Sequence, residues 1–200
     1  MAISLHIANI VIIAETHNPS ILTEEWLAKH GIIEDGKIKI RTREISVVHS
    51  DIVEMVADPQ RVQFSAMELN EKGLKHCVSA ARLYFKTLPH IPYKAFGFNF
   101  HYLVEEVDPT ESVEIFIKGE DLKKEILPLV SKNGFISHWS EMEANCRVTL
   151  EPKGNKGPEL MFNFHYELDD TVMDKVDVGL SNHVSFFKRS RELAQKIAGG

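Results

Sequence analysis

The chain has 200 residues, with 44% hydrophobic and 26% charged side chains and a formal net charge of −6. These values are typical of a globular protein and exclude the low-hydrophobicity, high-charge class of disordered chains. The acidic balance disfavours nonspecific nucleic-acid binding, because that binding needs a positive field to displace counterions. A chain of this length can bury a sizeable core, so we expect a single domain at residues 1–200.

The first expected element is a strand at residues 3–14, a β-branched run of the kind that is covered on both faces. This apolar start lacks a basic leading segment and is too short to cross a bilayer, so neither a targeting signal nor a membrane partner is expected. The two cysteines, Cys77 and Cys146, show no metal-like spacing. We expect free buried thiols and a reducing, cytoplasmic location.

The next segments read as a helix followed by a meander of strands. Asn18 and Pro19 predict a helix start, and Gly31 predicts its end. Between residues 37 and 67 the apolar positions alternate, with an Asp-Pro turn signal at 58–59. This pattern predicts two or three strands.

The rest of the chain alternates strand signals with two main helices. Residues 70–88 carry apolar positions at helical spacing and predict the first main helix. Further strands are expected at residues 93–105, 113–117, 135–150 and 160–168, and a short helix at 121–130. The second main helix is expected at residues 173–198, where Gly179 should weaken or kink it.

These elements predict an α+β fold, in which a single mixed, mainly antiparallel sheet is packed on one face by the two main amphipathic helices. Their order also fits a β-α-β(n)-α plan used twice, with pseudo-halves at about 1–90 and 91–200. The tetrapeptide Asn-Phe-His-Tyr occurs at residues 99–102 and again at 163–166. Internal duplication and a shared sheet environment both explain this repetition.

The repeated strands supply the candidate site. If they are close neighbours in one sheet, their polar residues project from the same wet face, because the inward aromatic residues fix the phase. The candidate ligand-binding residues on these strands and on the strand at 135–150 are Asn99, His101, Asn163, His165, Glu141, Glu143 and Arg147. The simpler interpretation is a solvated face, since a one-sided antiparallel sheet carries polar residues opposite its core.

Motifs that would name a reaction are absent from the sequence. There is no His-Glu-x-x-His pattern, no Gly-x-Ser-x-Gly pattern and no glycine-rich phosphate loop. No cofactor is therefore expected. A core or half-buried position is the default for Trp139, but it falls on the polar phase of its expected strand, which makes it a candidate interface anchor.

Three functions remain open. The favoured one is a non-catalytic, self-associating interaction or scaffold protein, so a homo-oligomer or a protein partner is expected. The second is binding of a small ligand on the wet sheet face, or of nucleic acid, to which the basic run from Lys37 to Arg43 could contribute. The third is a metal-dependent hydrolase with His101 and His165 as metal ligands. In that hypothesis Glu141 or Glu143 is the base, and Glu143 is the alternative third ligand.

Overall fold

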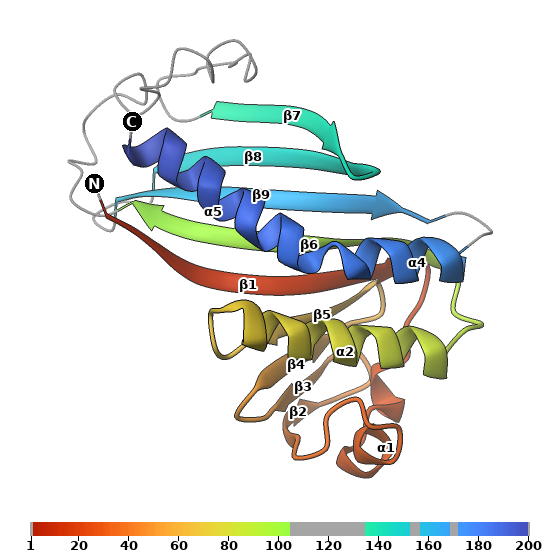
Figure 1. The fold of residues 1–200 in the computed structure, drawn as a ribbon. Helices are drawn as coiled ribbons and strands as arrows, with labels where there is room; N and C mark the ends of the chain where they lie inside the picture. Colours follow the sequence, from red (N-terminus) through yellow and green to blue (C-terminus); the bar gives the residue numbers. More distant parts are fainter. Residues whose placement is uncertain (1, 105–134, 153–156, 169–171, 200) are drawn as a thin grey trace.

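The computed structural model describes residues 2–104, 135–152, 157–168 and 172–199. Within these residues nine strands form one antiparallel sheet with the order β2-β3-β4-β5-β1-β6-β9-β8-β7 (Figure 1). The strands are β1 (Ile3–Ala14), β2 (Lys37–Arg41), β3 (Ser46–His49), β4 (Val53–Ala57), β5 (Arg61–Ala66), β6 (Tyr93–Val104), β7 (Phe135–Glu141), β8 (Ala144–Pro152) and β9 (Pro158–Glu167). The strand expected at 113–117 and the helix expected at 121–130 lie outside the described residues.

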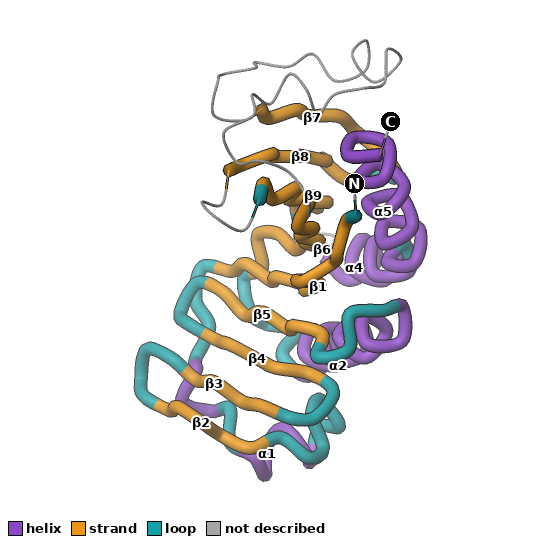
Figure 2. The backbone as a smooth tube through the Cα atoms, turned by 90° about the vertical axis from the view of Figure 1, so that its left-hand side faces the viewer, coloured by secondary structure: helices purple, strands orange, loops and turns teal. Residues whose placement is uncertain are grey.

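The described part of the chain also contains four α-helices and one 3-10 turn. They are η1 (Pro19–Ile21), α1 (Glu24–Lys29), α2 (Glu71–Thr87), α4 (Val172–Ser181) and α5 (His183–Gly199). The three helices α2, α4 and α5 lie on one face of the sheet (Figure 1), and none of them reaches the opposite face (Figure 2). The α+β fold with a large antiparallel sheet is therefore confirmed. Among the described helices, none combines the length and the apolar character that a bilayer-spanning helix requires.

Capping side chains explain where the first helices begin. The segment expected as one helix from Asn18 is divided, because the Asn18 side chain accepts from Ser20 N and caps η1, whereas the Thr23 side chain accepts from Trp26 N and caps α1. Gly31 follows α1 with φ of 66°, a conformation that favours glycine. Asn70 caps α2 in the same way by accepting from Gly73 N.

The core lies between the sheet and the three helices and is rich in aromatic rings. Phe96, Phe98 and Phe100 of β6 are fully buried. On the next strand Phe164 stacks on Phe186 of α5, with ring centroids 4.3 Å apart. Burial of each such ring contributes roughly 1.5–3 kcal/mol, so this layer dominates the stability of the second half of the sheet.

The second main helix is broken into α4 and α5 rather than being continuous. The backbone turns at Asn182, whose side chain donates to Tyr166 Oη. Gly179 allows α4 to approach the sheet closely, because a β-carbon at this position would lie 2.5 Å from Phe96 Cζ. The sequence predicts a weakened or kinked helix at Gly179, and the helix breaks three residues further on, at Asn182.

The meander contains four strands instead of two or three. The missed strand is β4, which pairs with β3 and with β5. A tight turn precedes it, in which Ser50 Oγ accepts from Val53 N and donates to Val53 O. The side chain of Ser50 satisfies backbone groups that would otherwise require a longer loop, and the sequence pattern did not reveal this turn.

Residues 135–150 form a hairpin, so the prediction of one long strand is wrong. Met142 and Glu143 have φ values of 49° and 64° and connect β7 to β8. Two successive residues with positive φ match the twist of a two-residue hairpin turn. Neither residue is glycine or asparagine, so the usual turn signal is missing. The expectation that Trp139 lies on the polar face of its strand is therefore wrong, and Trp139 lies on the helix-covered face.

Candidate metal centre

A row of polar residues crosses all nine strands on the face opposite the three helices. Residues directly opposite each other in adjacent antiparallel strands share one face of the sheet. Successive partners in this polar row are Lys37, His49, Glu54, Ser65, Asn9, Asn99, Asn163, Arg147 and His138. The helix-free face is therefore polar along a continuous line.

The middle of the polar row is a ladder of three amides. Asn163 Nδ2 donates to Asn99 Oδ1 over 2.8 Å, and Asn99 Nδ2 donates to Asn9 Oδ1 over 2.8 Å. Asn99 and Asn163, the first residues of the two tetrapeptides, are direct cross-strand partners. In this ladder the amide of each asparagine satisfies the next.

The candidate residues from the sequence divide into two groups. Asn99, His101, Asn163, His165 and Arg147 belong to the strand phase of the helix-free face.

The two glutamates lie elsewhere. Glu141 Oε2 accepts from Trp139 Nε1 over 3.1 Å and from Arg189 Nε of α5 over 3.2 Å, which places it on the helix-covered side. Glu143 is exposed in the hairpin turn. The hairpin reverses the chain at this point, so neither glutamate joins the histidines.

The proposed pairing of His101 with His165 on one metal ion is wrong. His165 lies opposite Gly97, whereas His101 lies opposite Met161, four residues further along β9. Four residues of a strand span about 13 Å, which is too far for two ligands of one ion.

His101 instead meets two residues that the sequence reasoning missed. His6 Nε2 lies 2.6 Å from Glu159 Oε1, and His101 Nδ1 lies 3.2 Å from the same oxygen. The donor atoms of the three side chains all lie within 4.8 Å of one another. We call these three residues the His-His-Glu cluster.

Three adjacent strands position the His-His-Glu cluster. Glu159, near the start of β9, lies opposite Leu103 of β6, which follows His101 by two residues on the same face. His6 stands at a register shift of β1, where Leu5 pairs with Tyr102 and Ile7 already pairs with His101. Such a bulge redirects a side chain relative to the regular alternation.

The burial of the cluster sets its electrostatics. The Glu159 side chain has 0% exposure, whereas the His6 and His101 side chains are 28% and 22% exposed. A buried carboxylate is costly unless positive charge or strong donors compensate it. The two imidazoles supply that compensation, either as hydrogen-bond donors or as fellow ligands of a cation.

The donor set fits a zinc-class ion. Two imidazole nitrogens and one carboxylate oxygen form one of the ligand sets of zinc sites that keep a fourth position open. A magnesium or calcium site would require mainly oxygen ligands. His6 Nδ1 is buried and has no hydrogen-bond partner among the described residues. The ring of His6 is therefore oriented through Nε2, the atom that faces Glu159.

The two cysteines take no part in this cluster. Both are free and buried, as expected. Burial raises the pKa of the Cys77 thiol to about 12 and likewise that of Cys146. Because the thiolate is the form that binds metal or attacks a substrate, neither thiol is reactive near neutral pH.

No protein-family model and no curated protein matches this chain.

Proposed function

We propose that this protein binds one zinc-class divalent metal ion through His6, His101 and Glu159. The observation that carries the proposal is the fully buried Glu159 carboxylate, which contacts imidazoles from two different strands. Three donor atoms of this type within 4.8 Å of one another form a small cage for a cation.

The distances within the cluster support a metal site. Tetrahedral ligands at about 2.1 Å from a zinc ion lie about 3.4 Å from each other. The His101–Glu159 separation of 3.2 Å is close to this value, and the His6–Glu159 separation of 2.6 Å would have to widen slightly. A side-chain rotation is sufficient for this change, since both imidazoles are partly exposed.

The surroundings indicate what the ion would do. Three protein ligands leave a fourth position for water or a substrate atom. His101 is two residues from Asn99 on the same strand face, so the amide ladder lies next to the cluster. A metal-held ligand that extends towards the ladder would meet neutral hydrogen-bonding groups, which suits polar substrates. Bound water at such an ion is also acidic enough to act in hydrolysis near neutral pH.

Zinc titration by calorimetry tests the proposal. We expect one ion per chain, and a loss of affinity of at least tenfold in each of His6→Gln, His101→Gln and Glu159→Gln. The matched controls are His165→Gln and His138→Gln, which change histidines of the same face without touching the cluster. Full affinity in the three cluster variants would refute the proposal, and far-ultraviolet circular dichroism of each variant identifies any loss of fold.

Self-association through a sheet edge is a second candidate function. The outer strands of the described sheet are β2 and β7. Strand β2 exposes Lys37, Lys39 and Arg41 and has a register shift, and both features discourage edge pairing. Each outer strand exposes one isoleucine at 47%, Ile40 on β2 and Ile136 on β7, but β7 contains no lysine or arginine. We expect a β7-mediated dimer in light scattering that Ile136→Lys converts to monomer, whereas a monomer at high concentration would remove this candidate.

A further inference from the structure

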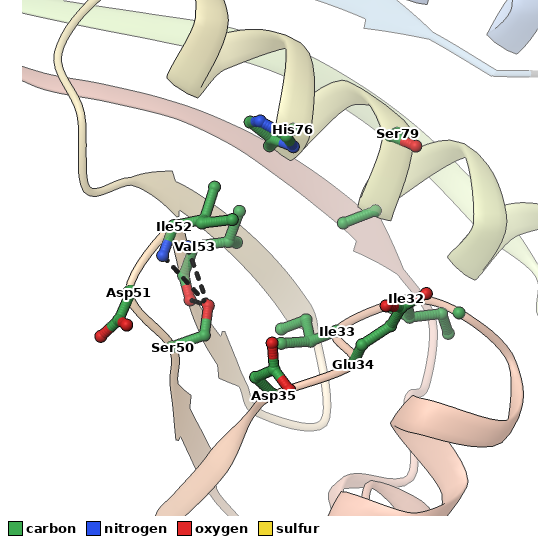
Figure 3. A pocket seen from close by; sticks show the side chains of 12 residues that line it. Ile32, Ile33, Glu34, Asp35, Ser50, Asp51, Ile52, Val53, His76 and Ser79 are labelled. Carbon is green, nitrogen blue, oxygen red and sulfur yellow. Dashed lines mark hydrogen bonds between the residues drawn. The ribbon is translucent and has the colours of Figure 1, made fainter.

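A pocket of about 380 Å³ lies under α2 at the turn between β3 and β4 (Figure 3), whereas the His-His-Glu cluster lies on β1, β6 and β9. The segments 31–35 and 50–53 and the helix α2 line it, and it is open to solvent. Its lining residues are Gly31, Ile32, Ile33, Glu34, Asp35, Ser50, Asp51, Ile52, Val53, His76, Ser79 and Ala80. This volume is in the range of sites that hold small molecules.

The apolar part of the pocket is fixed in place. Ile32, Ile33, Val53 and Ala80 are between 3% and 6% exposed, so their positions are set by the core. The turn at Ser50 is held by its own side chain, which bonds to the backbone of Val53. The pocket is thus preformed, and little ordering of the protein would accompany ligand binding.

The rim of the pocket is acidic. Glu34 and Asp35 lie on the side opposite α2, whereas the Asp51 carboxylate points outward at the edge of the pocket (Figure 3). The lining residues include one imidazole, His76 of α2, but no lysine or arginine, and these three carboxylates form no ion pair with the described residues. By contrast, the nearby carboxylate of Glu24 is paired with Lys37.

We infer that this pocket binds a small organic ammonium ion whose apolar part contacts the isoleucine side chains. The carboxylates of Glu34 and Asp35 attract the cationic head, and the isoleucines that line the pocket, of which Ile52 is 42% exposed, accept a short hydrocarbon body. An anion of the same shape would meet the negative charge of these carboxylates and should bind much more weakly. The inference is independent of metal binding, because no residue of the His-His-Glu cluster lines the pocket.

Methyl NMR titration with n-pentylammonium, and with pentanoate as the anion of matched shape, tests the inference. We expect saturable shifts of the Ile32, Ile33 and Ile52 methyl groups with the amine and none with pentanoate. Equal shifts with both compounds, or no saturable shift with the amine, would overturn the inference.

Variants at the rim separate charge recognition from simple hydrophobic contact. The double change Glu34→Gln and Asp35→Asn should weaken amine binding at least fivefold, because the two nearest carboxylates are lost. Glu25→Gln neutralises an exposed carboxylate of α1 outside the pocket and should leave the affinity unchanged. Ser79→Phe, at an exposed position of the rim, should fill the pocket and abolish binding. Unchanged affinity in the double variant would contradict the assigned role of the carboxylates.

Discussion

His17 shows how burial controls a single side chain. It is 4% exposed, and its Nδ1 lies 3.0 Å from Tyr84 Oη. Desolvation lowers the pKa of His17 from 6.5 to about 4, against the opposing effects of the Ile12 backbone and the Asp58 charge. The folded protein therefore keeps this ring neutral over a range in which the unfolded chain is protonated.

This difference predicts acid sensitivity. The pKa of His17 is lower in the folded protein than in the unfolded chain. The contribution of His17 to the free energy of unfolding is therefore fully present above pH 6.5 and is lost as the pH falls towards 4. The loss should amount to about 3 kcal/mol. Urea unfolding at several pH values measures it, and His17→Gln, which keeps a hydrogen-bonding group but cannot titrate, should flatten the profile between these limits. An equally steep profile in the variant would assign the acid sensitivity to other groups.

At the level of elements, the β7–β8 hairpin carries avoidable strain. Met142 and Glu143 both adopt positive φ, which costs a residue with a β-carbon about 1 kcal/mol or more. The Tyr166 hydroxyl donates to Met142 O and holds the turn in this shape. Only the backbone of Met142 takes part in that bond, so a change of the side chain keeps the bond but loses the partial packing of Met142 against the core.

Replacement of the turn by Met142→Asn and Glu143→Gly should therefore stabilise the protein by about 0.5–1 kcal/mol, since Asn-Gly is the preferred pair for this turn. Thermal unfolding reports the gain as a higher Tm. The control is Glu143→Ala, which keeps the β-carbon and should give no gain. A lower Tm for the Asn-Gly variant would mean that the Met142 side chain contributes packing that outweighs the strain.

Elements with regular periodicity could be predicted, whereas those defined by single turns could not. The helical spacing of α2 and the alternating aromatic residues of β6 and β9 follow from burial on one face, which the sequence pattern shows directly. The turn at Met142-Glu143 depends on tertiary contacts, such as the bond from Tyr166. A prediction from local turn residues therefore missed it and misplaced Glu141 on the polar face.

The candidate site depends on the whole molecule. His101 was identified because its phase on β6 is clear, and Glu159 shares a strand phase with Asn163 and His165 that could have revealed it. His6 gave no such signal, because a bulge in β1 sets its direction. The three residues meet only when β1, β6 and β9 become neighbours, and strand order cannot be derived from hydrophobic pattern alone.

X-ray absorption at the zinc edge of the zinc-loaded protein tests the metal proposal most directly. We expect a first shell of nitrogen and oxygen atoms at about 2.0–2.1 Å, with the outer-shell scattering of two imidazoles. That imidazole scattering should decrease by half in His6→Gln or His101→Gln. A shell with sulfur, a six-oxygen shell, or an unchanged spectrum in both variants would contradict binding of the ion by His6, His101 and Glu159.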